Sequence, residues 1–275
     1  MKNGIKYILI SNLFSLFVEI SVKSLSHVPF YFIAFYRSVI VMLICVVCLR
    51  KLKISLLGNN KKLLLIRGLT GTSALVLYFI TLQNLSLALA ITLQYLSLLF
   101  AVLFTSILSK NVPKKLQLLS LFLSFLGVVL VHDIQISQPL IYIFMGLLSA
   151  AFSGVAYTNI GVLNKTENTL VIMLYFSVTT LILVSPYSLS HWDFSFSFQN
   201  YLILICVGIS SYITQYYITK AYQSTSAIVI APASYLSLIL ASFVGYFVWD
   251  ESITIKMLMG MILILTGNIL ITVSK

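Results

Sequence analysis

Residues 5–25 read IKYILISNLFSLFVEISVKSL, an apolar run interrupted by a few polar side chains. Four of these, Asn12, Ser15, Glu19 and Lys23, are spaced three, four and four residues apart. Such spacing puts them on one face of an α-helix. An ionisable side chain in a membrane helix costs about 2.5–3.5 kcal/mol at the bilayer centre and almost always faces a bundle interior or a water-filled cavity. The stretch therefore predicts a membrane helix bordering a cavity, with Glu19 as the first candidate site residue.

The composition of the whole chain agrees with a lipid environment. The 275 residues are 60% hydrophobic and only 8% charged, and the mean hydropathy is +1.06. Soluble domains average about 25% charged residues. Only helices and closed barrels span a bilayer, and barrel strands alternate over about 10 residues. The longer, continuous apolar runs of this chain predict an all-α membrane protein.

Ten apolar segments follow one another with short gaps, each close to the length of about 20 residues that crosses a bilayer. They cover residues 5–25, 30–49, 63–82, 85–108, 114–132, 139–161, 168–187, 200–219, 226–248 and 254–273. No gap is long enough for a soluble domain. The sequence therefore predicts ten transmembrane helices.

The net charge of +11 comes from Lys and Arg residues in alternate loops, which indicates topology rather than nucleic-acid binding. With the N-terminus inside, only Lys23 and Lys256 fall outside, and Arg37 falls within the second segment. The inside set is Lys2, Lys6, Arg50, Lys51, Lys53, Lys61, Lys62, Arg67, Lys110, Lys114, Lys115, Lys165, Lys220 and Lys275. Positive loops stay in the cytoplasm, so we expect both termini there.

An internal repeat appears when the chain is shifted by 140 residues. Tyr95–Leu98 and Tyr235–Leu238 share the sequence YLSL at this shift, and Gly127 meets Gly267. The predicted repeats are residues 1–135 and 136–275, with five helices each. Because five is odd, the second repeat must be inverted relative to the first. Inverted repeats are typical of secondary transporters, which bind substrate near the midplane.

Short motifs along the chain carry a family resemblance. They are Arg67–Gly71, Leu87–Ala90, Tyr95–Leu98, Ala231–Tyr235, Trp249–Glu251 and Gly260 with Gly267, together with Tyr36-Arg37 and Lys23. They resemble the EamA-like family of the drug/metabolite transporter superfamily over essentially the whole chain. The resemblance implies a ten-helix bundle around a central cavity. Helices one, three, four, six, eight and nine would line it, five and ten would be peripheral, and the halves would rock to give alternating access.

The sequence differs from the family pattern at two positions, and one stretch resembles one group of relatives more than another. Relatives often have a proline near Leu98, and Asn111 stands where an acidic counterpart of Glu251 is expected. These departures concern the local bend and the loop contacts of the first half. The Arg67–Leu108 stretch resembles bacterial S-adenosylmethionine carriers more than the amino-acid exporters of the family.

Polar residues on the implied lining helices are the candidate site. Asn159 is the repeat counterpart of Glu19, and Thr92 that of Pro232, which frees a backbone carbonyl in the ninth helix. The predicted substrate-binding residues are Glu19, Asn12, Ser15, Tyr78, Gln94, Tyr95, Tyr157, Asn159, Gln215 and Tyr235, with Lys23 and Arg37 as secondary charge candidates. Further candidates are Thr70, Ser73, Thr81, Ser149, Ser153, Ser211, Thr214, Tyr216, Tyr217 and Ser234.

Each candidate has a structural alternative. Hydroxyls in membrane helices commonly bond their own or a neighbouring helix. Tyrosines near helix ends commonly lie in the interfacial belt. Lys23 can extend to the interface, and Glu19 can pair with Lys23 or Arg37.

The candidate residues suggest several substrates. A carboxylate among tyrosine faces complements an amine, a sulfonium or a quaternary ammonium. If Lys23 also faces the cavity, it and Glu19 would hold the two charged ends of an amino acid. We expect a secondary active transporter of a small amino-acid-like or cationic metabolite, such as S-adenosylmethionine, in the bacterial inner membrane. The alternatives are a carrier of anionic or phosphorylated metabolites bound by Lys23 and Arg37, and, less favoured, a non-transporting scaffold or membrane enzyme.

The sequence contains no catalytic constellation, metal-ligand spacing or phosphate-binding loop, so we expect no enzyme activity, cofactor or metal ion. Without an ATP site, an ion or substrate gradient must drive transport. Coupled protons or a counter-substrate are the expected partners, and a monomer is sufficient.

Overall fold

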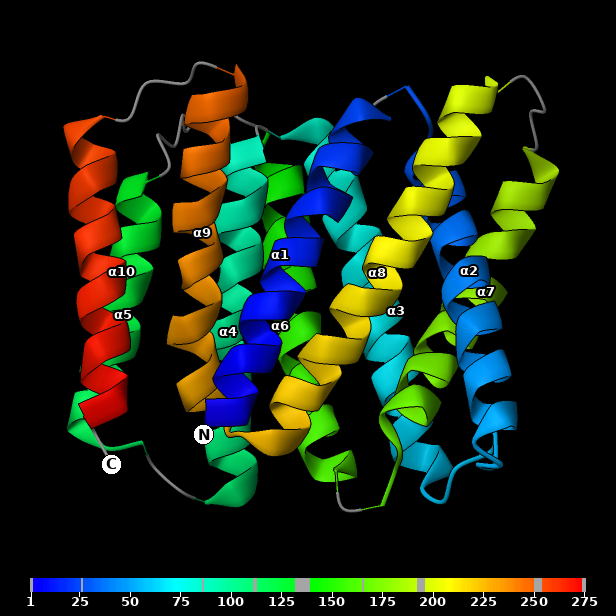
Figure 1. The fold of residues 1–275 in the computed structure, drawn as a ribbon, viewed down its shortest axis with the longest axis horizontal. Helices are drawn as coiled ribbons and strands as arrows, with labels where there is room; N and C mark the ends of the chain where they lie inside the picture. The colour runs from blue at the N-terminus through cyan, green and yellow to red at the C-terminus, as the bar shows by residue number, and fades with distance from the viewer. Residues whose placement is uncertain are drawn as a thin grey trace.

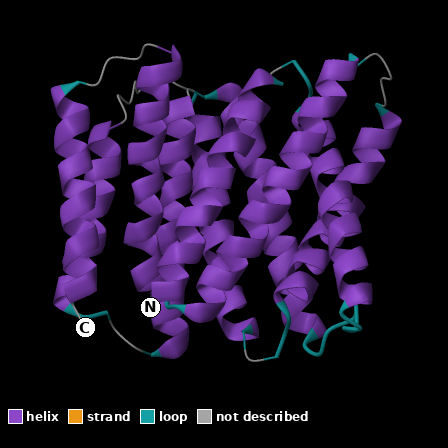
Figure 2. Ribbon diagram, viewed as in Figure 1, coloured by secondary structure: helices purple, strands orange, loops and turns teal. Residues whose placement is uncertain are grey.

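The computed structural model describes residues 2–25, 27–85, 87–110, 113–131, 139–164, 166–191, 196–249 and 254–273. Within these ranges the chain forms ten helices and no strand (Figures 1 and 2). The helices are α1 (Lys2–Ser24), α2 (Phe30–Lys51), α3 (Lys61–Asn84), α4 (Leu87–Ser109), α5 (Lys115–Val131), α6 (Leu140–Leu163), α7 (Thr169–Ser190), α8 (Phe198–Ser224), α9 (Ala227–Trp249) and α10 (Ile255–Val273). Each predicted apolar segment corresponds to one helix, which confirms the all-α prediction. Asn111, Asp250 and Glu251 lie outside the described residues.

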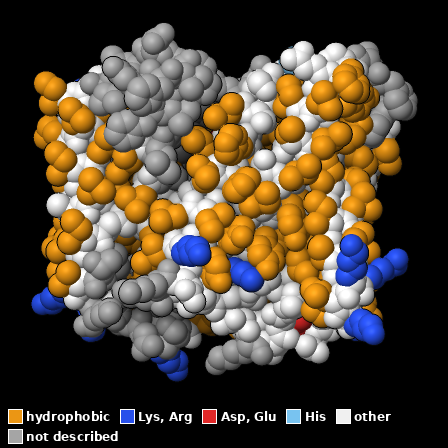
Figure 3. Space-filling model, viewed as in Figure 1, with side chains coloured by type: hydrophobic (Ala, Val, Ile, Leu, Met, Phe, Trp, Pro, Cys, Tyr) orange, Lys and Arg blue, Asp and Glu red, His pale blue; other side chains and the backbone are white. Residues whose placement is uncertain are grey.

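Six of these helices, α1, α2, α3, α6, α7 and α8, are long and apolar enough to cross a membrane by length and composition. The described apolar segments of α4, α5, α9 and α10 are shorter. Large hydrophobic side chains point outward from the bundle, including Ile107, Phe122 and Ile182, which are 59–67% exposed. Hydrophobic side chains are spread over the face shown in Figure 3, whereas Lys and Arg gather toward the end where the N-terminus lies. This outer surface suits contact with lipid.

The first five and last five helices interleave in one bundle. The five most extensive helix contacts, α1 with α8, α3 with α6, α4 with α6, α2 with α7 and α5 with α10, each join one helix of the first five to one of the last five. The α5–α10 pair lies at one edge of the bundle, as the resemblance implied (Figure 1). The centre is therefore surrounded by helices from both parts of the chain.

Small residues allow α5 and α10 to approach closely. A Cβ added to Gly127 would lie 2.5 Å from the carbonyl oxygen of Gly260. Ser120 Oγ donates a 2.6 Å hydrogen bond to the carbonyl of Gly267. Small side chains and interhelical hydrogen bonds replace the hydrophobic driving force that is missing between helices in lipid. The repeat-related glycines Gly127 and Gly267 thus lie at the same helix contact.

The loop between α2 and α3 is fastened to the start of α7 by Glu167, whose side chain is 8% exposed. Its Oε1 accepts hydrogen bonds from the backbone N–H groups of Asn59 at 2.7 Å and Asn60 at 2.5 Å. Asn59 Nδ2 also donates to the carbonyl of Thr166 at 2.8 Å, and the Tyr175 hydroxyl donates to the carbonyl of Leu57 at 2.7 Å. We call this set of contacts the Glu167 clip.

Candidate functional site

A cavity of about 210 Å³ lies inside the bundle. Its described lining comes from all six helices that the resemblance implied and also from α2 and α7, which contribute Arg37 and Phe176. The polar lining residues are Ser11, Asn12, Ser15, Glu19, Arg37, Arg67, Tyr78, Gln94, Tyr95, Ser97, Ser153, Tyr157, Ser211, Thr214, Gln215 and Ser234. The cavity therefore brings together side chains from both halves of the sequence.

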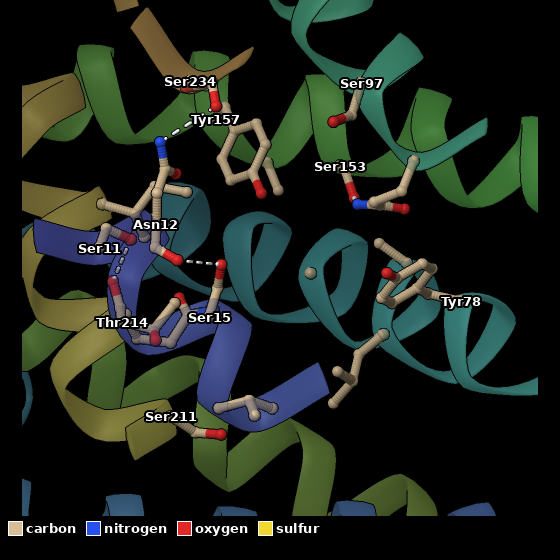
Figure 4. Close-up of a pocket in the computed structure, with 18 of the residues that line it drawn as sticks. Ser11, Asn12, Ser15, Tyr78, Ser97, Ser153, Tyr157, Ser211, Thr214 and Ser234 are labelled. Atoms are coloured by element: carbon tan, nitrogen blue, oxygen red, sulfur yellow. Dashed lines mark hydrogen bonds between the residues drawn. The ribbon is translucent and has the colours of Figure 1, made fainter. Parts of the chain in front are cut away.

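The polar face of α1 forms one wall, as its helical spacing predicted. Part of this face is used for packing: Ser11 Oγ donates to the carbonyl of Thr214 at 2.9 Å, and Asn12 Nδ2 donates to the carbonyl of Ser234 at 3.1 Å (Figure 4). Ser15 Oγ donates to the carbonyl of Asn12 at 3.0 Å. Asn12 thus joins α1 to α9 just beyond Pro232. The side chain of Lys23 lies outside the described part of the structure.

Glu19 lies one helical turn beyond Ser15 on the same wall. It makes no hydrogen bond or ion pair with any residue that the structure describes, so the alternative in which it pairs with Arg37 is not observed. A carboxylate normally accepts several hydrogen bonds. No described residue therefore uses the acceptor capacity of Glu19.

Two arginines share one aromatic ring in the cavity. The guanidinium carbons of Arg37 and Arg67 lie 5.4 and 4.7 Å from the ring centroid of Phe176. The side chains are only 6% and 3% exposed, respectively. Since both distances end on one centroid, the charges are at most about 10 Å apart. Two unit charges at 10 Å repel by about 1.7 kcal/mol at an effective dielectric constant of 20.

These two positive charges have few protein partners. Arg67 Nε and Nη1 are buried and have no hydrogen-bond partner among the described residues. Neither arginine forms an ion pair within the described ranges. The ring face of Phe176 supplies a cation–π contact but no counter-charge. With Glu19, the described cavity carries two formal positive charges and one negative charge.

Helix α8 adds further unpaired polar atoms. Ser211 Oγ, Thr214 Oγ1 and Gln215 Oε1 are buried without a hydrogen-bond partner in the described structure, and all three residues line the cavity. An unpaired polar group typically costs about 1–3 kcal/mol when it is buried. Three of them on one wall are suited to bind a polar ligand.

Gln94, by contrast, is held in a network. Its Nε2 donates to Ser153 Oγ at 3.1 Å, and its Oε1 accepts from Ser149 Oγ at 3.2 Å. Ser149 Oγ also contacts the carbonyl of Ala74 at 2.8 Å. The amide of Gln94 is therefore positioned by α3 and α6 at the edge of the cavity.

Three of the four mid-helix tyrosine candidates line the cavity: Tyr78, Tyr95 and Tyr157. The Tyr157 ring stacks on Tyr222 at 4.8 Å, with an interplanar angle of 9°. Tyr235 does not line the cavity. It is fully buried, and its hydroxyl donates to the carbonyl of Tyr95 at 3.3 Å. Its role in the structure is packing between α4 and α9.

Asn159 is also absent from the described lining. Its Nδ2 is buried and has no hydrogen-bond partner among the described residues. The 140-residue correspondence with Glu19 does not place the two side chains in the same cavity.

Several hydroxyl candidates adopt the structural alternative. Thr70, Thr81 and Ser234 donate to carbonyls four residues earlier in their own helices, at 2.7–3.0 Å. Tyr216 and Tyr217 do not line the cavity. Tyr216 instead lies 4.7 Å from Lys220 Nζ, measured to the ring centroid.

The sequence interpretation missed several cavity residues, among them Arg67 and Phe176. It counted Arg67 only among the cytoplasmic charges, whereas the structure buries its side chain in α3 against the cavity. Its place inside an apolar segment was a usable signal, since ionisable residues within such segments commonly face a cavity. Phe176 gave no such signal, because a phenylalanine in a membrane helix is as often turned toward lipid.

A cavity with polar lining residues inside an apolar helical bundle is the arrangement of a membrane transporter. The chain belongs to the EamA-like transporter family, whose model matches residues 2–132 and again residues 140–273. Bacterial members of this family are multi-pass inner-membrane proteins. The predicted family and the predicted role in membrane transport are confirmed.

Individual relatives share this class. The chain is 26% identical to the pseudopaline exporter CntI of Pseudomonas aeruginosa UCBPP-PA14, over 100% of this chain and 98% of the relative. It is 28% identical to an uncharacterized transporter of Helicobacter pylori 26695, over 98% and 94%. It is 24% identical to the S-adenosylmethionine uptake transporter of Rickettsia prowazekii Madrid E, over 55% and 51%. The relatives thus include both an exporter and an uptake carrier.

A solved crystal structure has the same fold, with a TM-score of 0.82 over 99% of this chain and 97% of the other. The sequences are 16% identical, so this likeness concerns the fold alone.

Proposed function

We propose that the protein is a secondary active transporter of a small amino-acid-like metabolite that carries both a positive group and a carboxylate. The observation that carries this proposal is one cavity lined by Glu19, a carboxylate with no partner among the described residues, and by two buried guanidinium groups, Arg37 and Arg67. Glu19 would bind the amine or sulfonium, and an arginine would bind the carboxylate. A plain cation fits less well, because it would share the cavity with two arginines.

The relatives support this class of substrate. Those with assigned roles are named for pseudopaline export and for S-adenosylmethionine uptake. S-adenosylmethionine is itself an amino acid with a sulfonium group, which matches the charges proposed here. The opposite directions of transport in the two names leave direction to experiment.

We further propose that residues 1–135 and 136–275 form two inverted repeats that rock to give alternating access. The helix contacts support a pseudo-two-fold relation. The 140-residue shift maps α1 onto α6, α3 onto α8 and α4 onto α9. The α1–α8 contact then corresponds to α6–α3, the α4–α6 contact to α9–α1, and the α3–α7 contact to α8–α2. All six contacts are present. The gathering of Lys and Arg at one end supports a cytoplasmic location of both termini (Figure 3).

A carrier of anionic or phosphorylated metabolites is the second candidate. The arginine pair favours it, because two guanidinium groups can neutralise a doubly charged anion. Glu19 opposes it, because a carboxylate in the same cavity would repel an anion that lacks a positive group.

Counterflow in proteoliposomes tests the proposal. The panel should contain amino acids, S-adenosylmethionine, simple amines, dicarboxylates and sugar phosphates, each against native protein and Glu19→Gln. We expect an amino-acid-like compound to be exchanged and Glu19→Gln to reduce its exchange about ten-fold, as the loss of about 1.4 kcal/mol of binding would. Exchange confined to anions, and unchanged in Glu19→Gln, would establish the second candidate instead.

A further inference from the structure

The cavity holds a pair of arginines whose counter-charge is missing from the described protein. Arg37 from α2 and Arg67 from α3 approach the Phe176 ring of α7. The three helices thus bring two guanidinium groups within about 10 Å of each other in a buried site. Such an arrangement is costly when empty, because two like charges have left water and repel each other.

The described acidic residues do not neutralise this pair. They are Glu19, which forms no ion pair with a described residue, and Glu167, whose Oε1 accepts from the backbone of Asn59 and Asn60. Arg67 moreover has two buried nitrogen atoms without a described partner. No described acidic residue is therefore left to supply the anion, and we infer that a ligand supplies it.

Guanidinium geometry indicates which anion. A carboxylate has two oxygen atoms and makes one bidentate contact with one guanidinium fork. A single carboxylate can make this bidentate contact with one arginine, and a second carboxylate gives the other arginine a bidentate contact of its own. With a positive group opposite Glu19, two carboxylates would bring the summed charge of substrate and described cavity to zero. A monocarboxylic amino acid would leave one positive charge unbalanced.

We propose that Arg37 and Arg67 bind two carboxylates of one substrate molecule, so that the transported metabolite is a dicarboxylic amino-acid derivative. This inference rests on the proposed function and narrows it. Unpaired Ser211, Thr214 and Gln215 supply further polar contacts along the same cavity.

Matched ligand pairs test the number of carboxylates. Purified protein in detergent is titrated with glutamate and glutamine, aspartate and asparagine, and iminodiacetate and glycine, and ligand-induced thermal stabilisation gives each half-saturation concentration. We expect at least one dicarboxylate to bind about ten-fold more tightly than its matched partner. Arg37→Met and Arg67→Met should each reduce that ratio to below about three-fold. Arg50→Met, at an exposed position near the end of α2, should leave it unchanged.

The unfolding temperature of the arginine variants without ligand gives a second test. A neutral side chain removes an unsatisfied buried charge, so Arg67→Met without ligand should unfold at the same temperature as native protein or a higher one. A markedly lower unfolding temperature would show that Arg67 is structural and would overturn the inference. Arg67→Lys keeps the charge but loses the planar fork, and should bind glutamate more weakly than native protein.

The two proposals fail differently. If no dicarboxylate is preferred while a monocarboxylic amino acid is exchanged in proteoliposomes, the dicarboxylate inference fails and the proposed function stands. If O-phosphoserine binds about ten-fold more tightly than glutamate, the arginine pair is a phosphate site and the inference is again overturned. If no amino-acid-like compound binds or exchanges, both proposals fail.

Discussion

Glu19 and Glu167 are the two acidic residues that the structure describes, and their surroundings are opposite. Glu167 lies at one end of the bundle, and its Oε1 accepts two backbone hydrogen bonds from the α2–α3 loop. Glu19 lies in the wall of the central cavity and accepts no hydrogen bond from a described residue. The Glu167 carboxylate holds the α2–α3 loop in place, whereas the Glu19 carboxylate has no hydrogen-bond partner among the described residues.

This difference separates charged residues that stabilise the bundle from those that are candidates for substrate binding. Buried polar groups in proteins are nearly always satisfied, so one that is not needs an explanation. Glu167 is explained by the loop that it holds. For Glu19, Arg37 and Arg67 we propose that a ligand supplies the missing partners. Variants of the two glutamates should therefore affect stability and transport in opposite order.

The largest effect on stability is expected from Glu167→Ala. It removes the acceptor of two backbone N–H groups, and hydrogen bonds to charged groups contribute about 1.5–3 kcal/mol each. We expect the free energy of unfolding to fall by about 3 kcal/mol, measured by denaturant titration in detergent. Substrate preference in counterflow should not change. Native stability in this variant would show that the Glu167 clip is dispensable.

The next largest effect is expected at Gly58, which has a φ of +62° in the α2–α3 loop. A Cβ there would lie 2.6 Å from Leu64 Cδ1 and 2.7 Å from Glu167 Oε2. Left-handed backbone costs an L-residue about 1–2 kcal/mol, so Gly58→Ala should destabilise by about 2 kcal/mol. Gly161→Ala is the matched control, because a Cβ there would lie 3.9 Å from the carbonyl oxygen of Tyr222, an ordinary van der Waals contact. Equal effects of the two variants would contradict the prediction.

A smaller effect is expected from Tyr175→Phe, which removes only the hydroxyl that donates to the Leu57 carbonyl. One neutral hydrogen bond contributes about 1 kcal/mol, and we expect a loss of that size in thermal unfolding. Tyr142→Phe, on α6, removes a hydroxyl for which the described structure has no hydrogen bond. It should change stability less than Tyr175→Phe does. A larger effect of Tyr142→Phe would show that the Tyr175 hydroxyl does not contribute to the Glu167 clip.

The smallest effect on stability is expected from Glu19→Gln. No described hydrogen bond or ion pair is lost, so the free energy of unfolding without ligand should change by less than about 0.5 kcal/mol. In transport, Glu19→Gln should have the larger effect of the two glutamate variants. Its rate of exchange of an amine-bearing substrate should be about ten-fold lower than that of native protein. A large loss of stability with unchanged transport would make Glu19 a structural residue like Glu167.

Much of the fold follows from local pattern. Ten apolar runs predicted ten helices, because a chain in lipid must satisfy its backbone hydrogen bonds within each segment. The spacing along α1 also predicted that Asn12, Ser15 and Glu19 share a face, because helical periodicity is a local property. Both expectations needed no knowledge of neighbouring helices.

The site was less predictable because it depends on contacts between distant segments. Repeat alignment suggested Asn159 and Tyr235, but helix rotation and packing decide which side chains reach a cavity, and both lie outside its described lining. Charge counting used Arg67 only as a cytoplasmic charge, although the structure buries it in α3. Glu167 was not singled out at all, because its partners are backbone N–H groups more than 100 residues earlier in the chain.

The sequence by itself determined the membrane environment, the helical segments and the polar face of α1, because hydrophobicity and helical period act over about 20 residues. Only the tertiary structure placed Arg37 and Arg67 around Phe176 and separated the free carboxylate of Glu19 from the bonded one of Glu167. These facts depend on how helices from the two halves interleave, and that packing is a long-range property.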